Sequence, residues 1–163
     1  MNDHLKEEDL VFMRIALEQA AQSAAIGEVP IGAVLVHQGT IVAQSHNNQE
    51  TWQDPTAHAE MIVIRESAKM LCRWRLIDTT LFVTLEPCAM CLGAIILARI
   101  PRLVFGATDP KAGACGSVLD FASNPRLNHR VDVVGGILAE DSQRMLTQFF
   151  KEIRTRQPDC RTS

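Results

Sequence analysis

Hydrophobic residues recur at helical spacing in four stretches of the chain. In the first stretch, Leu10, Met13 and Leu17 lie on roughly one face of a helix, and Gly27 follows as a stop signal. The same spacing returns three more times along the chain. It predicts helices at residues 8–26, 57–71, 88–98 and 140–156.

Short runs of β-branched and apolar residues between these helices predict strands. The first two runs flank Gln38-Gly39, a pair that favours a tight hairpin turn. Residues 47–55 are polar and turn-like, whereas residues 118–121 form a short apolar stretch that we interpret as a short helix. The predicted strands are residues 31–36, 41–44, 81–85, 103–105 and 131–134.

The resulting order of elements is α-β-β-α-β-α-β-(short α)-β-α. The hairpin makes the first two strands antiparallel, and helical crossovers are long enough to make the remaining pairs parallel and right-handed. We therefore expect an α/β fold in which a mixed five-stranded sheet carries helices on both faces.

Composition and length are those of one globular domain. The chain has 163 residues, and we expect a single domain over residues 1–163 that ends in a flexible tail at 157–163. Hydrophobic residues make up 47% and charged residues 21%, which excludes a disordered chain. No apolar run reaches the roughly 18 residues of a membrane span, so we expect none.

Several features indicate a cytoplasmic protein. Residues 2–9 lack the basic-then-apolar plan of a signal peptide. The five cysteines, an odd number with two of them three residues apart, suit a reducing compartment better than a disulfide framework. The net charge of −3 excludes a globally basic coat for nucleic acid but leaves room for a local basic face.

Two short segments at predicted helix starts carry the candidate chemistry. Cys88 and Cys91 are three residues apart, so they face the same way on a helix and can bind one ion. His58 begins the other helix and can add a nitrogen ligand. Two thiolates and one imidazole favour zinc over magnesium or calcium.

The number of ligands decides what kind of zinc site this is. A structural site is closed by four protein ligands, whereas a catalytic site leaves a position for water. Cys72 and Cys160 lie far from the other ligands along the chain, which leaves Cys115 as the rival fourth ligand. Glu60, two residues after His58, favours the catalytic alternative because a carboxylate there can accept a proton from water.

Each segment alone has an ordinary explanation. Cys-x-x-Cys is also found in redox pairs and zinc knuckles, and His-x-Glu occurs by chance in many helices. The joint pattern, in which His58 precedes Cys88 by 30 residues, is far more specific. It matches the His-x-Glu…Pro-Cys-x-x-Cys signature of zinc-dependent nucleobase deaminases.

Further motifs extend this match over nearly the whole chain, from the first helix to Phe149-Phe150. They are residues 27–33, 54–60, 84–91, 109–113 and 128–131. In these segments the chain resembles the bacterial tRNA-specific adenosine deaminases of the TadA type, within the cytidine/deoxycytidylate deaminase superfamily. Leu92 departs from that pattern, because relatives often carry a small residue there.

The resemblance implies a three-layer α/β/α cytidine-deaminase-like fold and a homodimer. It also implies hydrolytic conversion of the wobble adenosine (position 34) in a tRNA anticodon loop to inosine, with release of ammonia. By position, His58, Cys88 and Cys91 would hold one zinc ion per subunit, and Glu60 would carry protons. Asn47 would hydrogen-bond the target base or its sugar.

The sequence permits a partly independent test of RNA binding. Two local clusters of positive charge could contact phosphates, although each basic side chain can equally be a solvated helix residue. We expect one of Phe149 and Phe150 to seat the anticodon loop and the other to lie in the core. Aromatic residues are only 5% of the chain, which favours a pocket for one nucleotide over an extended stacking platform. The clusters are Arg65, Lys69, Arg73 and Arg75, and Lys151, Arg154, Arg156 and Arg161.

Two alternatives remain open at this stage. A deaminase of free guanine, cytosine or a nucleotide would share the zinc and Glu60 but need no basic surface. A zinc-stabilised RNA-binding module without catalysis would close the metal with four protein ligands and would not need Glu60.

Overall fold

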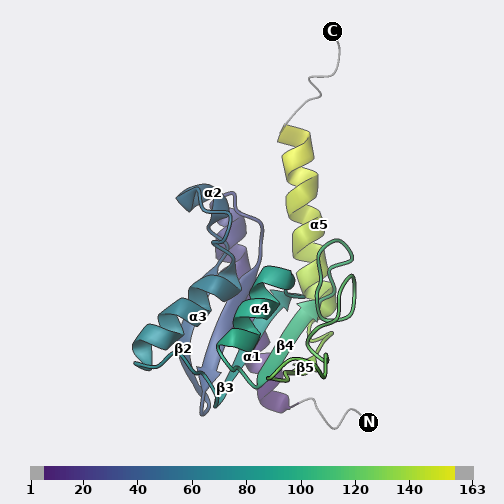
Figure 1. Ribbon diagram of the computed structural model, residues 1–163. Helices are drawn as coiled ribbons and strands as arrows, with labels where there is room; N and C mark the ends of the chain where they lie inside the picture. Colours follow the sequence, from purple (N-terminus) through teal and green to yellow (C-terminus); the bar gives the residue numbers. More distant parts are fainter. Residues whose placement is uncertain (1–5, 157–163) are drawn as a thin grey trace.

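A mixed five-stranded sheet forms the centre of the computed structural model, which describes residues 6–156. Helices cover both faces of this sheet (Figure 1). The predicted tail at 157–163 lies outside the described residues. The elements are α1 (Glu7–Ala25), β1 (Gly32–His37), β2 (Thr40–His46), α2 (Gln49–Trp52), α3 (Ala59–Met70), β3 (Thr79–Leu85), α4 (Ala89–Leu97), β4 (Arg102–Ala107), β5 (Asp132–Val134) and α5 (Ala139–Arg156).

The strand order in the sheet is β2-β1-β3-β4-β5. The predicted hairpin is confirmed: β1 and β2 are antiparallel, and Gln38 and Gly39 both have positive φ, as a tight two-residue turn requires. The β3–β4 and β4–β5 pairs are parallel, as expected. The expectation of parallel pairing was wrong for β3, which is antiparallel to β1. The crossover through α3 carries the chain past β1, so β3 runs like β2 but lies on the other side of β1.

Two further expectations about local structure were wrong. Residues 49–52, predicted as a turn, form the short helix α2. Residues 118–121, predicted as a short helix, form a loop instead. There the Gly113 carbonyl accepts hydrogen bonds from both Val118 N and Leu119 N, and Cys115 pairs with Asp120 in an isolated bridge. Val118 and Leu119 are exposed and only Phe121 packs against the core, so this stretch lacks the buried apolar face that would favour a helix.

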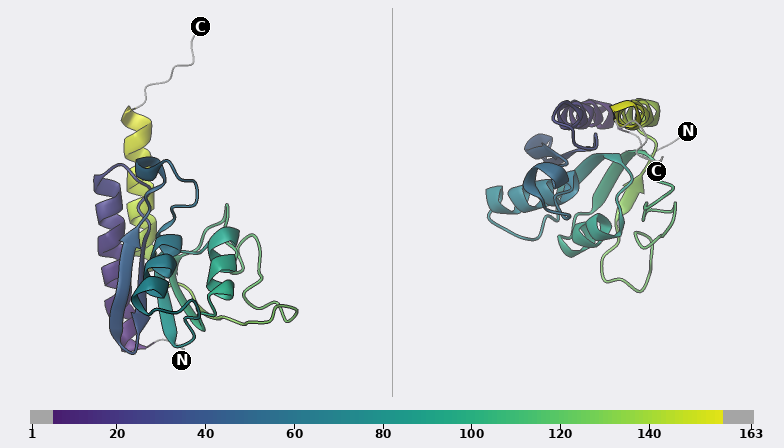
Figure 2. Two further views of the ribbon diagram at one scale, coloured as in Figure 1. Left: turned by 60° about the vertical axis from the view of Figure 1, so that its left-hand side comes forward. Right: turned by 90° about the horizontal axis from the view of Figure 1, so that it is seen from above.

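The alternation of side chains along β1 divides the core into two parts. Ala33 and Leu35 pack on the side of α3 and α4, whereas Val34 and Val36 pack on the side of α1. Seen from above, α1 and α5 lie together on one face of the sheet, and α3 and α4 lie on the other (Figure 2). The three-layer α/β/α arrangement is therefore confirmed. Within residues 6–156, no helix is both long and apolar enough to cross a membrane.

A buried ion pair fastens the start of α1 to the sheet. Asp9 is fully buried, and its two carboxylate oxygens accept hydrogen bonds of 2.7 and 2.8 Å from the guanidinium of Arg102 in β4. Asp9 also accepts the Lys6 backbone N–H at 3.0 Å. Burial alone would raise the pKa of Asp9, but these hydrogen bonds outweigh it and the pKa is lowered from 3.8.

We expect Asp9→Asn to lower the free energy of unfolding at pH 7 by roughly 3 kcal/mol, because it leaves the mostly buried Arg102 charge without its carboxylate partner. A carboxyl whose pKa is lower in the folded than in the unfolded chain stabilises the folded state at pH values above the unfolded pKa. This stabilisation is lost as the pH falls through the folded pKa. The difference between variant and wild type should therefore shrink below about pH 4. Urea unfolding at pH 7 and pH 3 measures it, with the exposed Glu18→Gln on the same helix as control. An unchanged stability at pH 7 would contradict the role of the pair.

Candidate metal centre

The candidate metal ligands sit where two helices begin. His58 is the residue immediately before α3, and Cys88 is the residue immediately before α4. Both have extended backbones at these positions, so the chain turns into the helix directly after the side chain. Cys91 lies in the first turn of α4, three residues after Cys88. At the start of each helix, unpaired N–H groups and the positive end of the helix dipole point toward the candidate ligands. This arrangement stabilises thiolates.

The three side chains converge on a single point. His58 Nδ1 lies 3.7 Å from Cys88 Sγ and 3.5 Å from Cys91 Sγ. All three donor atoms lie within 4.8 Å of one another. Ligands at zinc bond lengths in a tetrahedral site are separated by about 3.6 Å, which agrees with both distances. The fold therefore brings together the three residues that the sequence analysis selected as ligands.

The ionisation of the two thiols also fits a bound cation. Hydrogen bonds from Cys91 and His58 lower the pKa of Cys88 to about 4. The hydrogen bond to Cys88, together with burial, raises the pKa of Cys91. Without a cation, one sulfur is therefore stabilised as a thiolate at the expense of the other. A divalent ion between them would stabilise both thiolates, and a set of two sulfurs and one nitrogen is suited to zinc.

Cys115, the rival fourth ligand, does not join the cluster formed by the described residues. Burial raises the pKa of its thiol to about 12, so the thiol holds its proton. Cys72 is exposed beyond the end of α3, and Cys160 lies outside the described residues. Three protein donors are the number found in catalytic zinc sites, which keep a position for water.

Glu60 lies in the first turn of α3, two residues after His58, and is only 4% exposed. Its Oε2 is buried and has no hydrogen-bond partner within residues 6–156. Burial raises the pKa of this carboxyl to about 6. A buried carboxylate oxygen without a partner is costly to the fold, which indicates that a ligand or a proton normally meets it.

Asn47 is buried beside the start of α3. Its Oδ1 accepts the Ala59 backbone N–H at 2.9 Å, which holds the amide in one orientation. Its backbone N–H donates to the Ile31 carbonyl at 3.1 Å. No protein partner is found for Nδ2 among residues 6–156. Asn47 is therefore held by one half of its amide, while the other half is available to a bound molecule.

A cavity of about 530 Å³ is lined by residues bonded to or close in sequence to the candidate site, although none of the three candidate ligands, Glu60 or Asn47 lines it. Ile31, bonded to Asn47, and Leu85, three residues before Cys88, lie in its wall. Basic and aromatic residues also line the cavity: Lys111, Phe150 and Arg154. This cavity shares three of its lining residues, Thr108, Gln143 and Thr147, with a larger, shallower hollow.

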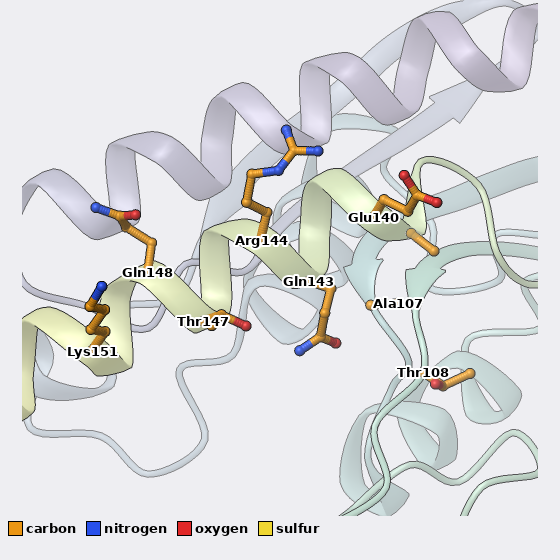
Figure 3. Close-up of a pocket in the computed structure, with 9 residues that line it drawn as sticks. Ala107, Thr108, Glu140, Gln143, Arg144, Thr147, Gln148 and Lys151 are labelled. Atoms are coloured by element: carbon orange, nitrogen blue, oxygen red, sulfur yellow. The ribbon is translucent and has the colours of Figure 1, made fainter.

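The larger hollow, of about 660 Å³, follows α5 and contains none of the three candidate ligands. Figure 3 shows Gln143, Thr147 and Lys151 projecting from successive turns of this helix. Through the shared residues, this hollow extends the first cavity along the helix.

The sequence analysis did not single out two buried carboxylates that hold the segments around this centre. Glu28 Oε1 accepts the Thr51 backbone N–H at 2.6 Å, which ties α2 to the segment after α1. Glu86 accepts hydrogen bonds from the loop that follows β4. The available signal was the position of each acid one or two residues before a proline at an element boundary, where a charged residue is buried only when it is paired.

Comparison with known proteins identifies the family. The family described as "Cytidine and deoxycytidylate deaminase zinc-binding region" matches residues 6–107. The tRNA-specific adenosine deaminase of Bacillus subtilis (strain 168) is 47% identical over 154 residues, which are 94% of this chain and 96% of that protein. The enzyme of the same name from Haemophilus influenzae is 48% identical over 149 residues, 91% of this chain and 86% of that protein.

Solved structures agree with these matches. A structure from a study of A-to-I editing by tRNA:A34 deaminases is 46% identical, with a TM-score of 0.81, and the match covers 83% of this chain and 99% of that one. Guanine deaminase from Bacillus subtilis is 30% identical with a TM-score of 0.61, over 98% of this chain and 99% of that one. On the family match and these relatives, the chain belongs to the zinc-binding cytidine and deoxycytidylate deaminase family, in its group of tRNA-specific adenosine deaminases.

Proposed function

We propose that this protein is a zinc-dependent enzyme that converts the wobble adenosine of a tRNA, at position 34, to inosine by hydrolysis. The net reaction replaces the exocyclic amino group of adenine by oxygen from water and releases ammonia. The observation that carries the proposal is the buried, unpartnered Oε2 of Glu60 beside the three convergent donors. The relatives named tRNA-specific adenosine deaminase support the choice of substrate.

In this proposal His58, Cys88 and Cys91 hold the zinc ion, one per subunit. When bound, zinc supplies a Lewis acid that makes water nucleophilic near neutral pH. The protein fixes the three ligands before the ion arrives, because two of them are set by helix starts and the third by the first helical turn. The open side of the site is then left for water and the base.

Glu60 is the group that moves protons. Its carboxylate accepts a proton from the attacking water and passes it to the purine ring, and it then takes the proton of the new hydroxyl group and passes it to the departing amine. Its burial serves this role, because a carboxyl with a pKa raised to about 6 gives up and takes up a proton readily near neutral pH. A purely structural zinc site would have no use for such a group.

Asn47 orients the nucleotide. Because Oδ1 is engaged by Ala59 N–H, the Nδ2 donor points in a fixed direction and costs little entropy when it binds an acceptor on the base or the ribose. A target nucleotide must be turned out of the anticodon loop to reach such a site, so a fixed donor helps to hold it there.

We expect Asn47→Asp to lower kcat/KM for tRNA by about 10- to 100-fold, because it removes the free donor but keeps the oxygen that accepts the Ala59 N–H. Zinc content should stay close to that of the wild type, whereas the melting temperature should fall slightly, because the second carboxylate oxygen is buried without a protein partner. Asn47→Ala removes both halves of the amide and should lower stability in addition. If the Asp variant retained wild-type kcat/KM, the Nδ2 contact would be refuted.

The structure separates the two basic clusters of the sequence. In the first, Lys69 pairs with Glu66 at 2.9 Å and Arg73 pairs with Asp78, while the Arg75 guanidinium lies 4.7 Å from the Trp74 ring centroid. These charges are largely satisfied within the protein. Basic residues of the second cluster line the two hollows along α5, and they are Lys151 and Arg154.

We therefore place the RNA-binding surface along α5 and the adjoining cavity. Phe149 is buried, whereas Phe150 is 44% exposed and lines the cavity, which agrees with the division of roles expected for this pair. An exposed aromatic ring beside Lys111 and Arg154 can stack on a base while the cations contact phosphates. This arrangement serves one or two nucleotides rather than a long single strand.

The homodimer and the cytoplasmic location remain predictions. Exposed apolar side chains such as Leu97, which is 74% exposed on the outward face of α4, support a dimer in which a second copy covers this face. Sedimentation analysis of wild type and Leu97→Asp tests it. The four cysteines within residues 6–156 are free thiols, as expected for a reducing compartment.

The substrate is tested by incubating the zinc-loaded protein with a tRNA that carries A34, an anticodon stem-loop, free adenosine and free guanine. Inosine in the tRNA and in the stem-loop is the expected result, and the same tRNA with G34 is the matched control. Turnover of free guanine without turnover of RNA would overturn the proposal and favour a free-base deaminase, the activity named for the B. subtilis guanine deaminase.

A further inference from the structure

The loop after β4 lines a cavity and also contacts the start of α4. Thr108, Asp109 and Lys111 of this loop line the 530 Å³ cavity. Further along, the Ala114 backbone N–H donates to the Pro87 carbonyl at 2.9 Å, and Gly113 pairs with Cys88 in an isolated bridge. The loop therefore lies directly against the start of α4, at the candidate ligand Cys88.

The carboxylate of Glu86 binds both ends of this loop. Its Oε2 accepts the Asp109 N–H at 2.9 Å and the Ser117 hydroxyl, and its Oε1 accepts the Cys115 N–H at 2.9 Å and the Ser117 N–H at 3.2 Å. Glu86 is only 2% exposed, so these hydrogen bonds compete little with water. All four donors belong to residues 109–117.

The close approach of Gly113 shows how tightly the loop encloses this carboxylate. A Cβ atom added to Gly113 would lie 2.4 Å from Glu86 Cδ, closer than any real contact. Only a residue without a side chain fits there. The loop and Glu86 are therefore packed as one unit, and the unit is continuous with Pro87 and Cys88.

We propose that Glu86 is a positioning residue that holds the loop of residues 109–117 against the start of α4 and thereby shapes the substrate wall of the site. The inference rests on the proposed function, since the wall matters to the nucleotide that lies beside it. Four donors aimed at two oxygens require a group that only accepts, so a glutamine of the same size would turn its NH₂ toward N–H or O–H donors.

The test compares Glu86→Gln with wild type by three measurements on the zinc-loaded protein. We expect faster hydrogen exchange at the backbone amides of Asp109, Cys115 and Ser117. The glutamine side chain keeps only one of the two acceptor oxygens to which these amides donate. We expect KM for tRNA to rise about tenfold while kcat changes less than about threefold, because the reacting groups are untouched. Zinc content should remain at one ion per chain.

Two further variants make the test decisive if Glu86→Gln folds poorly. Ser117→Ala removes one hydrogen bond and should shift exchange and KM in the same direction by about threefold. Asp120→Asn removes a negative charge from the same segment between β4 and β5. Asp120 bonds Ser123 and not Glu86, so this variant serves as the matched control. In the double variant the effects of Glu86→Gln and Ser117→Ala should not add, because both act on one contact.

Unchanged amide exchange in Glu86→Gln would overturn the anchoring role, and faster exchange with an unchanged KM would overturn its effect on the substrate. Exchange does not depend on activity. A wild type that shows the protected loop amides but converts no tRNA would therefore refute the proposed function and leave the anchoring by Glu86 standing.

Discussion

A Glu60→Gln variant is expected to lose about 10²- to 10⁴-fold in kcat while it keeps its zinc and its fold. The carboxylate is the proton carrier of the proposed reaction, and an amide of the same size cannot accept a proton from water. The Oε2 atom of Glu60 bonds no other group of the described chain, so its replacement breaks no hydrogen bond at that position. Removal of a buried carboxylate should leave the melting temperature equal to or above that of the wild type.

Inosine formation in single-turnover reactions measures the loss, and elemental analysis of zinc with thermal unfolding excludes loss of the metal or the fold. Glu66→Gln provides the matched control, because Glu66 lies on the same helix, is exposed and pairs with Lys69. Turnover within about threefold of wild type in Glu60→Gln would refute the proposed mechanism. It would favour the alternative of a zinc-stabilised RNA-binding module, in which Glu60 is expendable.

A Cys88→Ala variant is expected to lose zinc and activity together. The affinity for zinc should fall more than about 100-fold. Changing a residue that only hydrogen-bonds to a metal ligand usually lowers the affinity by about 10- to 100-fold, and the loss of a ligand should exceed this. Only two protein donors remain, His58 and Cys91, whereas a catalytic zinc site has three. Because bound metal stabilises the folded chain, the melting temperature should also fall toward that of the chelator-treated wild type.

Cys115→Ala is the matched control for this experiment, since Cys115 is the thiol that could have been the fourth ligand. It lies outside the three-donor cluster, so the variant should keep one zinc ion per chain. Zinc is counted after gel filtration in metal-free buffer. A stoichiometric ion in Cys88→Ala, or a lost ion in Cys115→Ala, would show that the ligands were assigned wrongly.

These variants also discriminate between the two kinds of zinc site. A structural site closed by a fourth protein ligand predicts that Glu60→Gln is active in RNA binding and that zinc loss unfolds the chain. A catalytic site predicts separate losses: Glu60→Gln loses chemistry alone, whereas Cys88→Ala loses metal and chemistry. The two results together therefore test whether the zinc site keeps one coordination position open for water, as the reaction requires.

Local patterns were sufficient to predict most of the secondary structure. The helical spacing around Met13 and the hairpin at Gln38-Gly39 each depend on residues a few positions apart, so the sequence alone specifies them. The candidate ligands were also found from local signals, because His58 and Cys88 stand at helix starts and Cys91 follows within one turn. Leu92, a departure from the family pattern, is fully buried in the core.

Where the outcome depended on contacts formed within a loop, helical spacing and charge pattern failed. The apolar stretch at Val118 has the composition of a short helix, but the Gly113 carbonyl accepts its backbone N–H and the stretch stays a loop. The basic residues after α3 look like a phosphate-binding cluster, yet Arg73 is paired with Asp78 from the following loop. In each case the partner is five residues away along the chain, and the path of the loop brings it into contact.

The sequence by itself determined where most helices and strands form, which residues can bind zinc, and that a carboxylate accompanies them. Each of these depends on neighbours in the chain. Only the tertiary structure decided that β3 lies beside β1, that α5 carries the basic hollows, and that Glu86 holds a loop from 23 residues or more away. Hydrogen bonds and packing between distant segments form only when the chain folds, so no local pattern encodes their partners.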